Sequence, residues 1–332
     1  MEAISNATQI HLDGMDLLKE RLEGIWMTGD YDLFSRYMQR GAEEFYRRLG
    51  IPRGASVLDV ACGSGQLALI AARNGARVNG CDIASNWIEK AKARAEAEGL
   101  DVEFEYGDAE DLPYTNGQFD AVVTIYGAMF APQPELVASE MVRVCRPGGL
   151  IAMANWTASG FVGRMFRTIS KYVAPAGMPP PVLWGDEETV QRRLESKVRD
   201  LRLTRRMHRF EYPFPPEDVV GFFRAYYGPM NRAFASLDLS GQKALHRALV
   251  DLWSSCNKAT ENNACRRRIP RGHWSSRCGL GNTVNRQRLR GSKAVRQATR
   301  ILGSNKPKDS VQVPIFWGEV SQKKLPIPIQ CN

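Results

Sequence analysis

Residues 57–65 read Val57-Leu58-Asp59-Val60-Ala61-Cys62-Gly63-Ser64-Gly65. The apolar start of this run predicts a buried strand, and its two glycines predict a tight turn. Because Gly63 and Gly65 have no Cβ, the N–H groups of the turn can approach a ligand closely. Asp59 stands just before the turn, where a carboxylate can reach a cationic or amine-bearing ligand. The run therefore predicts a ligand site at the end of a strand.

Strand and helix patterns alternate on both sides of this run. Strands are predicted at 56–60, 77–82, 102–106, 119–125 and 149–155, and helices at 65–74, 85–98 and 134–145. This alternation predicts an α/β fold, with a doubly wound, mostly parallel sheet and helices on both faces. Residues 9–27 and 33–49, upstream of the sheet, have helical periodicity.

Three regions are expected along the chain. Residues 1–50 form an N-terminal helical lid, 51–255 a ligand-binding domain, and 256–332 a basic tail. Within the domain, residues 158–198 look like an insertion that caps the sheet and, with 213–240, shapes a substrate pocket. The remaining predictions are a late strand at 199–212 and helices at 217–227 and 230–254.

The net charge of +9 is unevenly distributed. Residues 256–332 hold 16 Lys and Arg but three acids, so the rest of the chain is slightly acidic. The tail also lacks apolar periodicity, which predicts disorder. It has no interleaved aromatic residues and matches no known module, so we expect nonspecific attraction to polyanions and no specific nucleic-acid partner.

Cysteine usage and the N-terminus bear on compartment. The seven cysteines suggest no disulfide framework, and residues 1–6 do not resemble a signal peptide. No segment approaches the ~20 apolar residues of a spanning helix. We therefore expect a soluble, cytoplasmic protein without a membrane partner. A metal site is not expected, because the spacing of Cys256, Cys265, His273 and Cys278 fits no standard zinc ligand set.

The glycine turn by itself fits two ligand classes. Residues 63–68 satisfy the dinucleotide pattern G-x-G-x-x-A, and Asp82 follows Gly63 by 19 residues, near the acidic position expected for ribose. A tight strand–helix turn without any ligand is a further alternative. Asp59 argues against a dinucleotide, since a nearby carboxylate repels a pyrophosphate.

Two more segments narrow the choice. Gly107-Asp108-Ala109-Glu110-Asp111-Leu112-Pro113 follows the third strand, and Arg143-Val144-Cys145-Arg146-Pro147-Gly148-Gly149 leads into the fifth. In this order and spacing, and together with residues 57–65, they resemble the class I S-adenosylmethionine (SAM) dependent methyltransferases of the small-molecule type 11/25 group. The resemblance covers about residues 20–255.

The resemblance implies a Rossmann-like methyltransferase domain, SAM as cofactor, and methyl transfer to a small-molecule acceptor. It implies that Asp82 binds the ribose hydroxyls, Ile83 packs on the adenine, Asp108 and Ala109 hold the adenine edge, and Thr124, Ile125 and Tyr126 line the methionine half. The turn contributes Asp59, Ala61, Gly63 and Gly65. Trp26 and Tyr31, in Trp26-Met27-Thr28-Gly29-Asp30-Tyr31, resemble an aromatic lid over the cofactor.

Several roles stay open at this point. Asp82 could instead cap a helix, Asp108 could be a turn residue, and Trp26 and Tyr31 could be ordinary packing residues. No catalytic residue is assigned, because Tyr126, Tyr226, Tyr227 and His208 are better explained by packing. The functional alternatives are an NAD(P)-dependent oxidoreductase and a non-catalytic SAM-binding relative.

The tail departs from the family pattern. Members usually end in an antiparallel hairpin whose last, acidic and apolar strand inserts into the sheet, but here residues 265–274 read Cys-Arg-Arg-Arg-Ile-Pro-Arg-Gly-His-Trp. Codons exist for these residues that read, one base later, as Val-Val-Asp-Glu-Tyr-Leu-Glu-Val-Ile. Our hypothesis is a frameshift near Asn263 that removes the final strand, and the coding DNA tests it.

Overall fold

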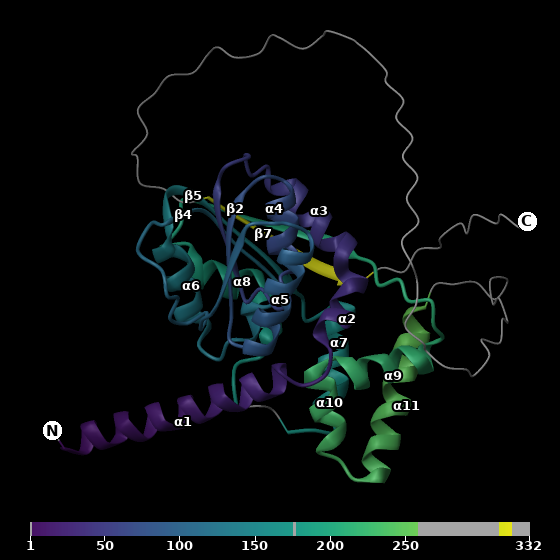
Figure 1. Cartoon of the computed structure of the whole chain (residues 1–332). Helices are drawn as coiled ribbons and strands as arrows, with labels where there is room; N and C mark the ends of the chain where they lie inside the picture. The colour runs from purple at the N-terminus through teal and green to yellow at the C-terminus, as the bar shows by residue number, and fades with distance from the viewer. Residues whose placement is uncertain (1, 175–176, 258–311, 321–332) are drawn as a thin grey trace, which may run out of the picture. The chain divides into compact units, whose positions relative to one another are not determined.

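The computed structural model describes residues 2–174, 177–257 and 312–320. A seven-stranded sheet forms its centre, with the order β3-β2-β1-β4-β5-β7-β6 (Figure 1). The strands are β1 (Ser56–Val60), β2 (Arg77–Asp82), β3 (Val102–Tyr106), β4 (Phe119–Ile125), β5 (Cys145–Trp156), β6 (Asp200–His208) and β7 (Gln312–Val320). All neighbouring strands pair in parallel.

The first four strands have the predicted bounds. Residues 56–60 and 119–125 are mainly apolar, 102–106 alternate between apolar and polar, and turn residues separate all four strands. The central strands β1 and β4 are buried along nearly their whole length, as expected for a parallel sheet covered on both faces. β5 is longer than predicted and begins at Cys145. Its register against β4 shifts between Phe119 and Ala121, because residues 146–149 loop out before regular pairing resumes at Leu150.

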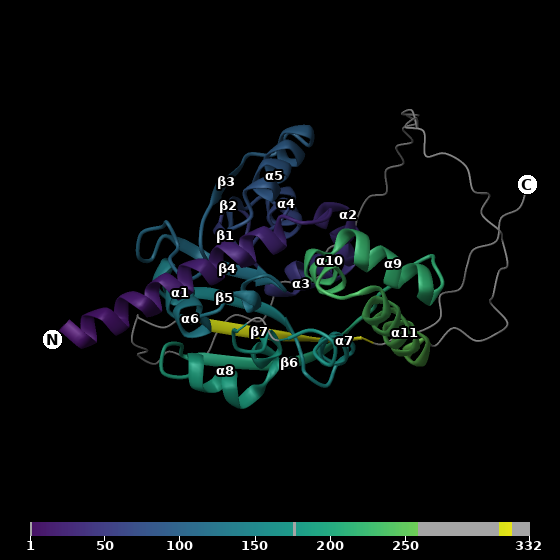
Figure 2. The same ribbon diagram turned by 90° about the horizontal axis from the view of Figure 1, so that it is seen from below.

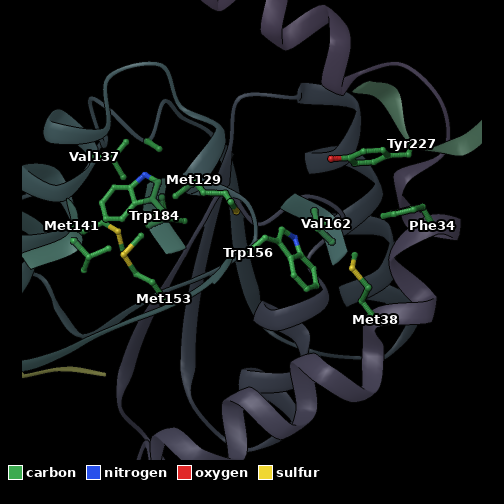
Figure 3. Close-up of a cluster of buried hydrophobic side chains, with 14 of the residues drawn as sticks. Phe34, Met38, Met129, Val137, Met141, Met153, Trp156, Val162, Trp184 and Tyr227 are labelled. Carbon is green, nitrogen blue, oxygen red and sulfur yellow. The ribbon is translucent and has the colours of Figure 1, made fainter. Parts of the chain in front are cut away.

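Helices cover both faces of the sheet. On one face α3 (Gln39–Leu49), α4 (Gln66–Arg73) and α5 (Ser85–Ala97) pack on a core that includes Val57, Val78 and Ala152. The other face carries α6 (Pro134–Val144) and α8 (Glu187–Leu194), whose core surrounds the indole of Trp184 (Figure 3). The predicted fold class, a doubly wound, mostly parallel α/β sheet, is confirmed.

The N-terminal region is helical, as predicted, but more finely divided. It comprises α1 (Glu2–Trp26), α2 (Tyr31–Ser35), the 3-10 helix η1 (Arg36–Met38), and then α3. The break falls at the predicted residues 28–31, where Gly29 adopts φ of 89° and the Asp30 side chain caps α2 by accepting from Leu33 N. This break turns the chain from α1 into α2.

Residues 158–198 are more regular than expected. They contain α7 (Phe161–Ile169), the 3-10 helix η3 (Pro181–Gly185) and α8, and they connect β5 to β6. The helices of this segment pack on the sheet core through Met165, Trp184 and Val190. The run Pro179-Pro180-Pro181 marks only the start of η3.

A group of three helices follows β6: α9 (Pro216–Tyr226), α10 (Gly228–Ala235) and α11 (Leu239–Cys256) (Figure 2). The predicted single helix at 230–254 is divided at residues 236–238, where Asp238 caps α11 by accepting from Gly241 N. Phe223 of α9 packs on Phe34 of α2, with ring centroids 4.9 Å apart. The helices after β6 thus support the N-terminal lid.

β7 corrects the expectation that the sheet lacks a final strand. Residues 312–320 lie between β5 and β6 and run parallel to both, whereas the family pattern predicts an antiparallel strand at this place. A parallel neighbour needs a crossover of a dozen or more residues, and residues 209–311 are long enough to supply one. Cys265–Trp274, on which the frameshift hypothesis rests, lie outside the described residues.

Removal of β7 tests its contribution. A chain truncated after Asn257 leaves the facing edges of β5 and β6 unpaired, and exposed edges promote association. We expect aggregation and a melting temperature lower by several degrees, since each kcal/mol lost lowers it by roughly 2–4 °C. Scanning fluorimetry and light scattering measure both. A chain truncated after Val320 is the control, and equal behaviour of the two would show that β7 adds nothing.

Candidate functional site

The main cavity lies at the carboxyl ends of β1, β2 and β4. It has about 710 Å³ of empty space, including its open mouth. The strand order reverses between β1 and β4, and ligands of open parallel sheets bind at such a point. The lining residues are Lys19, Leu22, Trp26, Tyr31, Ala61, Gly63, Asp82, Ile83, Trp87, Asp108, Ala109, Tyr126, Gly127, Ala128, Phe130, Ala131 and Pro132.

The glycine turn has the conformation that its residues predict. Gly63 and Gly65 adopt φ of 53° and 78°, in the left-handed region. A Cβ on Gly65 would lie 2.8 Å from the ring of Phe104, and one on Gly63 would lie 3.1 Å from the ring of Tyr31. Glycine is therefore required at Gly65 both for conformation and for space. Gly63 lines the cavity, whereas Gly65 lies behind it as the N-cap of α4.

Among the described residues, two other than glycine have positive φ, and both line the cavity. Ala61, after β1, has φ of 55°, and Tyr126, after β4, has φ of 59°. The left-handed conformation costs roughly 1–2 kcal/mol for such residues. The backbones at Ala61 and Tyr126 can approach closely because the next residue, Gly127, has no side chain. A Cβ on Gly127 would lie 2.4 Å from the Ala61 carbonyl oxygen. Backbone strain of this kind is concentrated at functional sites.

Asp59 is buried behind the turn. Its Oδ2 accepts from Ala68 N at 2.9 Å, while its Oδ1 has no hydrogen-bond partner among the described residues. Burial, together with the charge of Asp82, raises the pKa of Asp59 to about 8, although the hydrogen bond from Ala68 N opposes the shift. The carboxyl group lacks a compensating positive charge, which a cationic ligand could supply.

Asp82 connects two of the strand ends. Its Oδ2 accepts from Gly63 N at 2.8 Å and its Oδ1 from Ala84 N at 2.8 Å. Burial raises the pKa of Asp82, although these hydrogen bonds oppose the shift. α5 begins at Ser85 with no side-chain cap, so Asp82 is more than a helix cap. It holds the turn and also faces the cavity, as the ribose interpretation requires.

Asp108 lies at the other end of the cavity, after β3. Its Oδ1 accepts from Glu110 N at 2.9 Å, which makes it a turn residue as well as a lining residue. Its Oδ2 pairs with Lys19 Nζ of α1 at 2.6 Å, and the same Nζ lies 2.7 Å from Glu110 Oε2. The sequence did not point to Lys19, because nothing local predicts a contact across 89 residues.

Aromatic side chains of the lid form one wall. The ring of Trp26 lies 4.9 Å from Phe130 and 5.9 Å from Tyr227, measured between centroids. Trp87 Nε1 donates to the Trp26 carbonyl oxygen at 2.7 Å and fastens the end of α1 to α5. Trp87 also lines the cavity and was missed from the sequence, although an aromatic residue just after Asp82 is a usable signal.

Tyr31 lies over the glycine turn. Burial, with the nearby charges of Asp82 and Asp59, raises the pKa of Tyr31, so its hydroxyl stays protonated. The adjacent Asp32 pairs with Arg94 of α5 at 2.9 Å, and Arg94 also donates to the Ser64 carbonyl oxygen at 2.9 Å. α2 is thereby fixed to the turn that it covers. Both predicted lid residues, Trp26 and Tyr31, line the cavity while also packing against the core.

A second, smaller cavity adjoins the first. It has about 390 Å³ of empty space and shares Tyr31, Ala61 and Tyr126 with the main cavity. Ile125 lines it, whereas Thr124 is fully buried and its Oγ1 accepts from Ala128 N at 3.2 Å. Of the thirteen predicted binding residues, nine line the main cavity, Ile125 lines the second cavity, and Asp59, Gly65 and Thr124 lie behind the main cavity. Among the described residues, none of 158–198 or 213–240 lines either cavity.

Four residues were considered as catalytic candidates. Tyr126 lines both cavities, whereas Tyr226, Tyr227 and His208 line neither. Tyr227 stacks on Phe34 at 4.9 Å, which is a packing role. His208 is buried beside Trp156 with no partner for its Nε2 among the described residues, and burial lowers the pKa of His208 to about 4. Its imidazole is therefore neutral at pH 7 and a weak base.

The described residues hold neither a candidate metal-ligand cluster nor a candidate membrane-spanning helix. Within 2–174, 177–257 and 312–320, no three His, Cys, Asp or Glu side chains gather as metal ligands. In the same ranges no helix has the length and apolar character needed to cross a bilayer. Four residues were considered above as zinc ligands. Three of them lie outside the described residues: Cys265, His273 and Cys278.

Known proteins resemble this chain in sequence. The profile described as a methyltransferase domain matches residues 57–149. An uncharacterized protein of Mycobacterium tuberculosis is 38% identical over 223 residues, which is 64% of this chain and 79% of that protein. A demethylmenaquinone methyltransferase of Thermus thermophilus is 34% identical over 154 residues, 44% of this chain and 70% of that protein.

Solved structures resemble it less closely. A putative methyltransferase of Bacillus halodurans aligns with a TM-score of 0.45 and 22% identity, over 61% of this chain and 81% of that one. The family membership of the chain follows from its sequence. It rests on the identity and coverage of the Thermus relative and on the matched domain around the glycine turn. The chain belongs to the class I SAM-dependent methyltransferase family.

Proposed function

We propose that this protein binds SAM in the main cavity and transfers its methyl group to a small-molecule acceptor. The observation that carries the proposal is the convergence of Asp82, Asp108 and the glycine turn on one cavity. Behind it lies Asp59, whose Oδ1 has no hydrogen-bond partner among the described residues. The acceptor and its nucleophilic atom are not assigned. The Thermus relative, by its name, acts on a small molecule, demethylmenaquinone, which supports this acceptor class.

The lining fits each part of SAM. Asp108 and the apolar Ala109 and Ile83 suit an adenine, since a carboxylate accepts from the exocyclic amino group. Asp82 suits two ribose hydroxyls, because each of its oxygens uses one lone pair on a backbone N–H and retains another. The glycine turn and Asp59 suit the methionine half, which carries an ammonium and a sulfonium.

Bound SAM supplies a methyl group on a positively charged sulfur, and transfer leaves the electron pair of the broken bond on that sulfur. The chain's own contribution is to position both reactants, which can supply about 7–11 kcal/mol of the barrier reduction. Trp26, Tyr31 and Tyr126 exclude water and present aromatic faces, and a cation–π contact contributes ~0.5–2 kcal/mol. A dedicated base is not required for an acceptor that is already nucleophilic.

Two alternatives remain as competing proposals. An NAD(P)-dependent oxidoreductase would place a pyrophosphate near the carboxyl groups of Asp59 and Asp82. A negatively charged pyrophosphate and a nearby buried carboxylate repel each other strongly. A non-catalytic SAM-binding relative would retain the cavity without turnover. A cytoplasmic setting also stays a proposal, supported by the free, buried thiols of Cys62, Cys81 and Cys145.

Calorimetric titration with SAM and with NAD(H) separates the ligand classes. We expect SAM to bind and NAD(H) not to bind. Asp82→Ala should weaken SAM binding by about 10- to 100-fold, because hydrogen bonds to a charged group contribute ~1.5–3 kcal/mol each. Asp101→Ala, an exposed carboxylate before β3, is the matched control and should leave affinity unchanged. Binding of NAD(H) alone would overturn the assignment.

The raised pKa of Asp59, about 8, predicts proton-linked binding. Below pH 8 the free protein holds this proton, and a cationic ligand favours the carboxylate, so binding expels the proton. SAM affinity should therefore rise between about pH 6 and pH 8, by at most about tenfold per pH unit, and then level off. Calorimetry in buffers of different ionisation enthalpy counts the protons released.

Asp59→Asn is the control, because it retains an acceptor for Ala68 N but cannot titrate. The ligand's own amino group also titrates near this range, so the measured quantity is the difference between wild type and variant. The same pKa predicts that the stability of the cofactor-free protein falls as pH rises from about 4, where unfolded Asp ionises, to about 8. Equal proton release by both proteins would contradict the role of Asp59.

A further inference from the structure

Lys19 connects the lid to the loop that ends the cavity. Its Nζ lies 2.6 Å from Asp108 Oδ2 and 2.7 Å from Glu110 Oε2, so one ammonium group pairs with two carboxylates. Lys19, Leu22 and Trp26 all line the cavity, and their spacing places them on one face of α1. α1 therefore forms a wall of the cavity, and Lys19 is the ionic contact at its adenine end.

The partner carboxylates are firmly held. The side chain of Glu110 is fully buried, and it accepts from Gln133 N at 2.5 Å and from Gln133 Nε2 at 2.9 Å. Asp108 is fixed by the N–H of Glu110 at 2.9 Å. Lys19 thus links α1 both to the loop after β3 and to the turn that precedes α6, and movement of α1 must break this link.

Lys19 stays charged in this position. Burial favours the neutral amine, but the hydrogen bonds to Asp108 and Glu110 outweigh that effect and raise the pKa of Lys19 above its ordinary value. Without its ammonium, two carboxyl groups would remain close together, one of them buried, with no cation between them. Removal of the charge would therefore remove the ionic contact that holds α1 against this loop.

We propose that Lys19 is a positioning residue of the cofactor site, which latches α1 over the adenine end and so controls the rate of cofactor release. The proposal rests on the proposed SAM site. Lys19 and an adenine amino group can share Asp108, since a carboxylate oxygen accepts more than one hydrogen bond. The latch therefore closes on the bound cofactor and does not compete with it.

A solely structural ion pair predicts a different result. The Lys19–Asp108 pair is partly exposed, and pairs of this kind contribute only about 0–1 kcal/mol to folding, whereas loss of the cation beside the buried Glu110 carboxylate costs more. The latch, by contrast, acts on release, because the ligand leaves only after the link between α1 and the loop has opened. The rate of SAM release, measured well below the melting temperature of each protein, therefore separates the two roles.

Stopped-flow fluorescence measures release, with Trp26 and Trp87 in the cavity wall as intrinsic reporters. SAM is displaced from full-length protein by excess S-adenosylhomocysteine. Lys19→Met should release SAM about tenfold faster, which corresponds to about 1.4 kcal/mol, at a temperature where both proteins are fully folded. Lys19→Arg retains the charge and should restore release to near the wild-type rate.

Lys92→Met is the matched control, since Lys92 forms an exposed pair with Glu89 at 2.9 Å on α5, and it should leave release unchanged. Higher ionic strength should speed release from wild type more than from Lys19→Met. The latch alone would be overturned if Lys19→Met released SAM at the wild-type rate, or if Lys19→Arg released it as fast as Lys19→Met. Failure of the wild-type protein to bind SAM would overturn the proposed function and the latch together.

Discussion

Asp82 forms the contact on which the site depends. Its carboxylate accepts the N–H of Gly63 from the turn after β1 and the N–H of Ala84 from the start of the segment after β2. Parallel pairing already brings these two strand ends to one edge of the sheet. The hydrogen bonds then fix the glycine turn in the left-handed conformation that opens the cavity. The lid residue Tyr31 rests on this turn, so the lid also depends on it.

The same contact sets the electrostatics of the cavity. Asp59 and Asp82 are both buried, and burial raises the pKa of each. Of the two, Asp59 has only one backbone N–H donor and an oxygen without a described partner. Arg94 lies close to the turn but is engaged by Asp32 and the Ser64 carbonyl. A positively charged ligand would therefore favour the ionised form of Asp59, which burial disfavours in the free protein.

The sequence predicted the sheet well and the lid contacts poorly, for a physical reason. Strands such as 56–60 and 119–125 are buried on both faces, so their continuous apolar character is visible locally. Nine of the thirteen predicted binding residues line the main cavity, and seven of these lie at the ends of parallel strands, which meet at one edge. Lys19 and Trp87 escaped notice because their roles arise only when α1 folds back over the sheet. α7 and η3 were not predicted, since α7 is short and contains Gly163, and η3 begins at the last residue of a run of three prolines.

The tail and the site are separable in this architecture. The cavity is built from the ends of β1, β2 and β4 with α1 and α2, whereas β7 lies between β5 and β6. A change in the tail reaches the cavity through the two strands beside β7. The last residue of β5, Trp156, stacks on the ring of Tyr126 at 3.9 Å, and His208 at the end of β6 lies 5.9 Å from the same ring. A tail that differs from the family pattern should therefore affect the stability of the sheet first. The acidic residues that define the cofactor site would keep their positions, because each is held by backbone groups of its own loop or of a neighbouring one.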